Sequence, residues 1–98
     1  MIQVRFLPAA EAELLHETDY YSKARKGFGV RFKDAVKAAS DRAARTPEAG
    51  APGLGGTRKF RVTGFPFNLY YRHSEYDVLV VAIAPDSKRP GYWLPRIK

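Results

Sequence analysis

The chain has 98 residues, enough for one hydrophobic core and too few for two. It contains no cysteine, which excludes disulfides and thiolate metal sites. Seventeen Lys and Arg outnumber ten Asp and Glu, and residues 51–98 hold eight of the basic residues but only three of the acidic ones. This excess predicts an interaction surface in the second half, for a nucleic acid or an acidic protein partner.

Neither the first residues nor the apolar run near the end of the sequence indicates a membrane protein. The first residues lack the basic and then long apolar organisation of a signal peptide, and the apolar run 78–84 is too short to cross a bilayer. We therefore expect a soluble, cytoplasmic protein.

The first half predicts one strand and two helices. Residues 3–7 alternate as a short strand, and Pro8 suits the first turn of a helix that ends near Arg25. Helical spacing places Ala10, Leu14, Leu15, Thr18 and Tyr21 inward, with Glu11, Glu13, Glu17 and Asp19 outward. A second apolar stripe starts at Phe28 and ends before Pro47, so the two helices form an antiparallel hairpin.

The second half predicts three strands. Residues 47–57 are rich in Gly and Pro and are expected to form a flexible connection. Residues 58–63 and 67–72 alternate in polarity, while 78–84 is apolar on both faces, as in a central strand. The expected fold is therefore α+β, in one domain spanning 1–98. A two-helix N-terminal hairpin packs on a small, mainly antiparallel four-stranded sheet in the order β-α-α-β-β-β, followed by a C-terminal tail.

The helices would cover one face of this sheet and leave the other partly open. On the open face we expect Lys59, Arg61, Tyr70 and Arg72. The tail that follows combines basic, aromatic and turn residues, in the order Pro85-Asp86-Ser87-Lys88-Arg89-Pro90-Gly91-Tyr92-Trp93-Leu94-Pro95-Arg96.

Several segments, in order along the chain, resemble toxins of the RelE/ParE superfamily from bacterial type II toxin-antitoxin, or plasmid stabilisation, modules. The matching segments are 6–14, Asp19-Tyr20-Tyr21, Gly29-Val30-Arg31-Phe32, Thr46-Pro47-Glu48-Ala49-Gly50, Phe65-Pro66-Phe67-Asn68-Leu69-Tyr70-Tyr71-Arg72 and Arg89-Pro90-Gly91-Tyr92-Trp93. The Pro-Glu-Ala-Gly, Phe-Pro-Phe and Arg-Pro-Gly-Tyr-Trp segments resemble the ParE-type branch most closely.

The resemblance implies two alternative activities. ParE-like members poison DNA gyrase and need no catalytic group, whereas RelE-like members cut messenger RNA on the ribosome without a metal. An endonuclease would draw on Arg61, Arg72, Arg89 and Tyr92, with Lys59 or Lys88 as the general base. Many relatives place a histidine where this chain has Pro85-Asp86, and an acidic side chain there would repel phosphate, so we favour the gyrase alternative.

As a gyrase poison, the chain would bind its target through Lys59, Lys88, Arg89, Tyr92, Trp93 and Arg96, with aromatic anchors and steering cations. Tyr92 and Trp93 could instead cap the core, and Arg61, Arg72 and Arg89 could instead lie on a solvated face or pair with a carboxylate. We expect no cofactor and no metal. The expected partner is a cognate antitoxin with an acidic, partly disordered segment, in a hetero-oligomer. A third alternative is a non-toxic family member that only binds its antitoxin.

Overall fold

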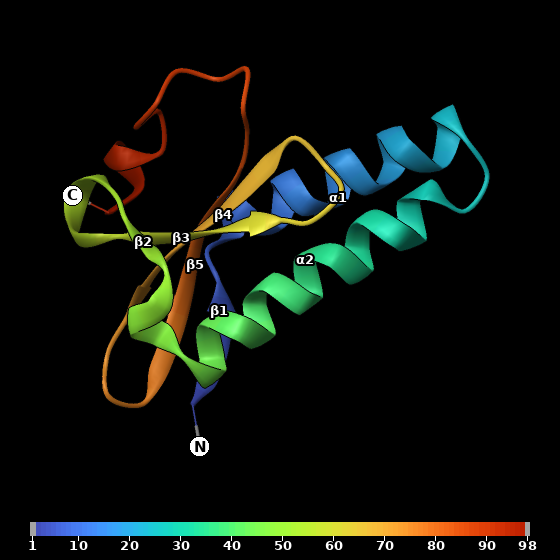
Figure 1. Cartoon of the computed structure of the whole chain (residues 1–98). Coiled ribbons are helices and arrows are strands. Elements are labelled where there is room, and N and C mark those ends of the chain that lie inside the picture. Colours follow the sequence, from blue (N-terminus) through green and yellow to red (C-terminus); the bar gives the residue numbers. More distant parts are fainter. Residues whose placement is uncertain (1, 98) are drawn as a thin grey trace.

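The computed structural model describes residues 2–97, in which two helices cover one face of a five-stranded sheet (Figure 1). The elements are β1 (Gln3–Phe6), α1 (Pro8–Ala24), α2 (Phe28–Arg45), β2 (Ala51–Pro52), β3 (Arg58–Val62), β4 (Phe67–His73) and β5 (Asp77–Pro85). Short 3-10 turns lie at Pro47–Ala49, Leu54–Gly56 and Leu94–Ile97. The α+β class and the helical hairpin are as predicted.

The sheet has the order β1-β5-β4-β3-β2. β1 runs parallel to β5, and all other neighbours are antiparallel. The prediction of four strands was one short, because β2 has only two residues and lies in the segment that was expected to be flexible.

That segment, 47–57, is held by specific contacts. The Tyr71 hydroxyl donates to the Pro47 carbonyl at 2.5 Å, and Arg58 donates to the Gly50 carbonyl at 2.9 Å. Gly50 approaches the Tyr71 ring so closely that a Cβ would lie 2.3 Å from its hydroxyl. Glycine has no side chain and so permits close approach of the backbone here. From composition alone, the same glycines suggested a flexible segment.

The main core lies between the helices and the sheet. Its helical side includes Ala10, Phe32 and Val36, and its sheet side includes Leu69 and Ile83, all at most 1% exposed. Aromatic rings close the end nearest the helical turn, where Tyr21, Phe32, Phe65 and Phe67 have ring centroids 5.0–6.3 Å apart. Leu15, predicted to face inward, is instead 61% exposed.

Gly29 allows the two helices to cross closely at the start of α2. A Cβ on this residue would lie 2.7 Å from the Thr18 carbonyl oxygen of α1. The residue is buried within α2. The hairpin therefore depends on the absence of a side chain at this position.

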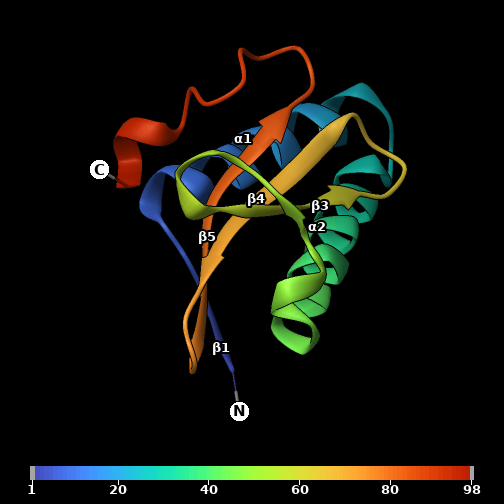
Figure 2. The ribbon, with the colours of Figure 1, turned by 60° about the vertical axis from the view of Figure 1, so that its left-hand side comes forward.

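After β5, the chain turns back and its last described residues pack on the sheet face opposite the helices (Figure 2). Trp93 forms a second, smaller core there with Val81, Ala82 and Ala84. The tail thus covers part of the face that was expected to be open.

Candidate interaction surface

The side chains predicted for the open face lie there. Alternation along β3 and β4 buries Phe60, Val62 and Leu69 on the helical side. The opposite side then carries Lys59 across from Tyr70 and Arg61 across from Asn68. The strand pattern therefore located these groups correctly, but the tail changes their surroundings.

Trp93 packs in the second core. It is 1% exposed, and its ring lies 4.7 Å from the Tyr70 ring. This burial agrees with the alternative that Trp93 caps the core, and direct contact of Trp93 with a target stays a prediction. The apolar side chains of Leu94 and Ile97 complete this cluster.

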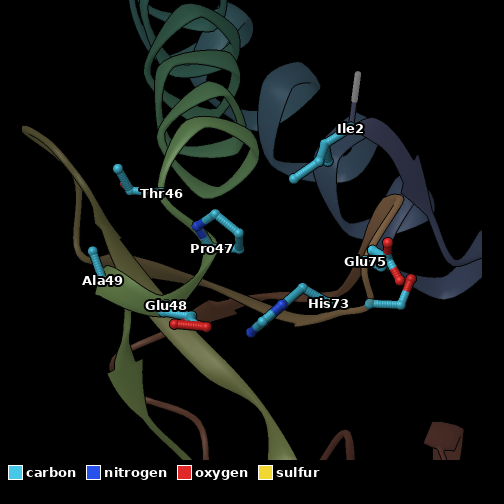
Figure 3. Close-up of a pocket in the computed structure, with 8 residues that line it drawn as sticks. Ile2, Thr46, Pro47, Glu48, Ala49, His73 and Glu75 are labelled. Carbon is cyan, nitrogen blue, oxygen red and sulfur yellow. The ribbon is translucent and has the colours of Figure 1, made fainter.

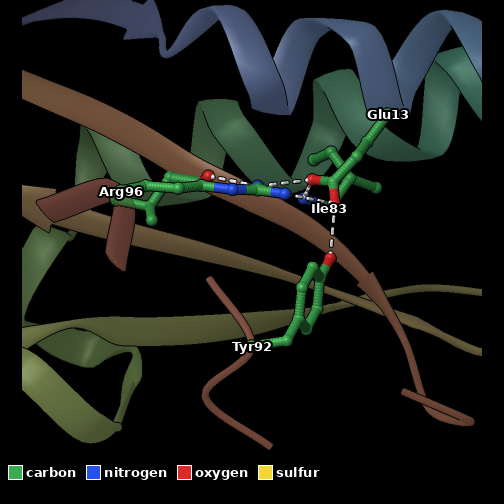
Figure 4. A network of polar contacts seen from close by, with 5 residues as sticks. Glu13, Ile83, Tyr92 and Arg96 are labelled. Carbon is green, nitrogen blue, oxygen red and sulfur yellow. Dashed lines mark hydrogen bonds and ion pairs between the residues drawn. The ribbon is translucent and has the colours of Figure 1, made fainter. Parts of the chain in front are cut away.

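Glu13 on α1 is the centre of a polar network that fastens the tail (Figure 4). Arg96 donates two hydrogen bonds to its carboxylate, each at 2.9 Å, and the Tyr92 hydroxyl donates a third at 2.5 Å. The side chains of Glu13 and Arg96 are only 20% and 22% exposed. Glu13 was predicted to face outward and instead binds Tyr92 and Arg96, whose role in target binding stays a prediction.

The network lies beside the part of β5 that extends beyond the end of β1. β1 pairs with β5 only as far as Val80, and a bulge falls at the next residue, because Tyr71 pairs with Val80 while Tyr70 pairs with Ala82. Beyond this point Glu13 accepts from the Ile83 amide at 3.0 Å and Arg96 donates to the Val81 carbonyl at 3.0 Å. The two side chains thus satisfy backbone groups that a longer β1 would have paired.

Sequence reasoning missed Glu13, although a signal was present. It lies three positions after the buried Ala10 and beside Leu14, so helical spacing places it at the border of the inner face. Its partners follow about eighty residues later, and no local pattern connects them.

The network also fixes the protonation of Tyr92. Burial raises the pKa of its hydroxyl, and the hydrogen bond to the Glu13 carboxylate raises it further. The phenol therefore gives up its proton less readily than an ordinary tyrosine does. A tyrosine held in this way is poorly suited to the proton-transfer role that an endonuclease would require.

Arg61 is paired with a carboxylate, which was one of its two predicted alternatives. Its guanidinium donates to both oxygens of Asp86, at 2.7 and 2.8 Å, and Asn68 donates to the same carboxylate at 3.4 Å. The hydrogen bond from Arg61 lowers the pKa of Asp86, so the carboxyl keeps its charge to a lower pH than an ordinary aspartate. The pair removes Arg61 from the cations available for phosphate.

Three further predicted cations, Lys59, Lys88 and Arg89, lie around two adjoining hollows of 320 and 130 Å³. Lys59 lines the larger hollow, Lys88 and Arg89 line the smaller one, and Tyr70, Pro90 and Trp93 line both. Lys88 lies 4.8 Å from the centre of the Tyr92 ring, and Lys59 lies 5.8 Å from that of Tyr70. Arg72, Lys88 and Arg89 are exposed, so the tail and the sheet together present a basic surface with an aromatic floor.

Another hollow, of 680 Å³, lies between the turn after α2 and the β4–β5 turn (Figure 3). Glu48, His73 and Glu75 are among its lining residues. Its acidic side chains do not suit a phosphate ligand. Throughout 2–97, no group of three or more histidines or carboxylates is arranged to hold a metal ion.

None of the helices between residues 2 and 97 is long and apolar enough to cross a bilayer.

Comparisons with known proteins agree with this architecture. The family model for the ParE toxin of type II toxin-antitoxin systems, parDE, matches residues 4–90. A solved structure, the chromosomal ParDE TA system from P. aeruginosa, superposes with a TM-score of 0.71 at 17% identity, over 87% of this chain and 96% of that one. At this identity the superposition supports the fold alone. A search of curated proteins finds no match.

Proposed function

The chain belongs to the ParE toxin family of type II toxin-antitoxin systems, and from this premise we propose that it arrests growth by binding and poisoning DNA gyrase. A poison of this kind traps an enzyme that already holds cleaved DNA, so it needs a complementary surface and no catalytic group.

The proposal is supported by one observation: residues that an endonuclease would use are already bound to other side chains of the chain. Cleavage by the RNA 2′-hydroxyl needs a base, an acid and cations free to stabilise the charged transition state. Here Arg61 is held by Asp86, and the Tyr92 hydroxyl is held by Glu13 with a raised pKa. These contacts favour a binding role over catalysis.

The basic surface formed by the tail and the sheet supplies the positive charge that a binding role requires. Lys88 and Arg89 are exposed on the loop after β5, and Lys59 and Arg72 lie on neighbouring strands of the sheet. Cations of this kind accelerate encounter with an acidic or DNA-bound target and help to set its orientation. The net charge of +7 acts in the same direction.

A type II toxin is paired with a cognate antitoxin. We propose that the antitoxin contributes an acidic, partly disordered segment that folds on the toxin in a hetero-oligomer, because the excess of positive charge favours an acidic ligand. The complex would form in the cytoplasm, where gyrase also acts.

The test is to induce the chain without antitoxin and to follow incorporation of labelled thymidine and methionine during the first minutes. We expect DNA synthesis to fall first. In parallel, the purified chain should inhibit supercoiling by gyrase and increase the amount of linear, gyrase-bound DNA. An earlier fall in protein synthesis, with messenger RNA cut on ribosomes, would overturn the proposal in favour of the endonuclease. Unchanged growth would indicate a non-toxic member that only binds its antitoxin.

A further inference from the structure

Residues 87–91 form a short loop between β5 and the last 3-10 turn, here called the basic loop because it carries Lys88 and Arg89. Two hydrogen-bonded turns shape it, from the Lys88 amide to the Pro85 carbonyl at 3.1 Å and from the Tyr92 amide to the Arg89 carbonyl at 3.3 Å. Gly91 has a φ of +80°, a left-handed conformation that favours glycine. The loop itself is exposed apart from Gly91.

The first end of the basic loop is fastened to the sheet. Asp86 is held by the two hydrogen bonds from Arg61 on β3, and its amide donates to the Pro66 carbonyl at 2.9 Å. The Arg61 and Asp86 side chains are 51% and 44% exposed. An ion pair this exposed contributes little to global stability, so the effect of its loss is expected in the position of the loop and much less in the free energy of unfolding.

The second end is fastened to α1. Tyr92 and Arg96 both bind Glu13, and the intervening Trp93 is buried in the second core. Lys88 also lies over the Tyr92 ring. One of the two cations of the loop is therefore in contact with the residue that anchors its far end.

We propose that Asp86 and Glu13 are positioning residues that hold the basic loop from both ends, so that Lys88 and Arg89 are already oriented for the target. This inference rests on the proposed function. A loop that is ordered before binding avoids the entropic cost of ordering its side chains in the complex. Neither carboxylate needs to touch the target, because each acts through the loop.

The chain offers a matched control for the first anchor. Arg5 and Asp77 form another arginine-aspartate pair on the sheet, with hydrogen bonds of 3.0 and 2.6 Å and side chains 57% and 27% exposed. It is of the same chemical kind as the Arg61–Asp86 pair, but it joins β1 to β5 and not the basic loop.

The experiment measures the concentration of purified chain that halves supercoiling by gyrase, for Asp86→Asn, Asp77→Asn, Asp86→Arg, Arg61→Asp and the double exchange Arg61→Asp/Asp86→Arg. We expect Asp86→Asn to raise this concentration about tenfold, because the loop must then be ordered on binding. Asp77→Asn should stay within about twofold of the original chain. The exchange should recover most of the loss caused by either of its single substitutions.

Two results would overturn the inference. One is an equal effect of Asp86→Asn and Asp77→Asn. The other is an exchange that fails to recover inhibition, which would mean that Arg61 or Asp86 contacts the target itself.

For the second anchor, Glu13→Gln should weaken inhibition to a similar degree, and Tyr92→Phe tests the same contact with the ring retained if Glu13→Gln does not fold. Unchanged inhibition by the folded variant would overturn this half of the inference.

A second measurement separates this inference from the proposed function. Native-state tryptic cleavage after Lys88 reports loop opening without gyrase. Cleavage should be faster in Asp86→Asn than in the original chain, and unchanged in Asp77→Asn. Equal cleavage rates in the two variants would contradict the proposal that Asp86 anchors the loop. If the chain does not inhibit gyrase, but Asp86→Asn still accelerates cleavage after Lys88, the result would contradict the proposed function and leave the anchoring of the loop intact.

Discussion

Glu13 and Arg96 lie 83 residues apart in the sequence and form a two-point ion pair between the first helix and the C-terminal tail. Both are mostly buried, and both also bind the backbone of β5. The pair therefore joins three parts of the fold at one place.

Removal of one partner should destabilise the chain. Glu13→Ala leaves the Arg96 charge partly buried without its carboxylate and leaves the Ile83 amide without its acceptor. We expect a loss of about 2 kcal/mol in the free energy of unfolding, measured in urea. The control is Asp19→Ala, an exposed residue of the same helix whose pair with Lys23 contributes below about 0.5 kcal/mol. Equal effects of the two substitutions would contradict a structural role for the network.

Trp93 should contribute through packing. Trp93→Ala removes a side chain that is 1% exposed, and we expect it to cost about 3–5 kcal/mol of stability. Trp93→Phe should cost less and leave the inhibition of gyrase by the folded protein unchanged. Loss of inhibition by a stable Trp93→Phe variant would show that the indole itself contacts the target.

Gly29 should resist replacement. A Cβ there would lie 2.7 Å from the Thr18 carbonyl, so Gly29→Ala forces the helices apart. We expect a loss of about 1–3 kcal/mol, although alanine is intrinsically the better helix former by about 1 kcal/mol. Thermal unfolding measures the sum of the two effects. Val30→Ala, at a position 65% exposed in the same turn, is the near-neutral control.

Stability should fall slightly in acid, because two exposed ion pairs are lost there and each contributes little. Hydrogen bonds from Arg5 and then Ser74 lower the pKa of Asp77, and the bond from Arg61 lowers that of Asp86. A carboxyl whose pKa is lower in the folded state stabilises above its unfolded pKa of about 3.9, and this stabilisation is lost as the pH falls through the folded value. Urea unfolding between roughly pH 5 and pH 2 should show the decline. The double variant Asp77→Asn/Asp86→Asn should give a flatter profile, and an unchanged slope would contradict these pairs as its source.

The cations of the basic loop should determine inhibition of gyrase. We expect Arg89→Glu to weaken it about tenfold or more at low salt, with a smaller effect at high salt, because exposed charges are screened. The matched control is Arg45→Glu, an exposed reversal at the end of α2. If both reversals had the same effect, net charge and not the loop would govern the interaction.

The sequence predicted most of the fold because local periodicity governs it. The alternation that buries Phe60 and Val62, and the helical spacing of Phe32 and Val36, each lie within one element. Hydrophobic burial then determines which face turns inward.

The candidate site was harder to predict because its contacts join distant parts of the chain. The sequence indicated Tyr92, Trp93 and Arg96 as candidate target-binding residues, but it did not indicate their contacts with Glu13 and the second core. The side chain of a polar residue at the border of an apolar stripe can point to solvent or into the fold. It points into the fold when a hydrogen-bonding partner lies there, and the local sequence pattern does not reveal that partner.

The parallel pairing of β1 with β5 has a consequence for how the polypeptide acquires its structure. Gln3 pairs with Asp77 and Phe6 with Val80, so β1 has no sheet neighbour among residues 2–97 until β5 has been synthesised. Pairings between such distant residues slow folding, because a long stretch must be closed before they form. β1 therefore pairs only after β5 is complete, and among the described residues it remains an edge strand of the finished sheet.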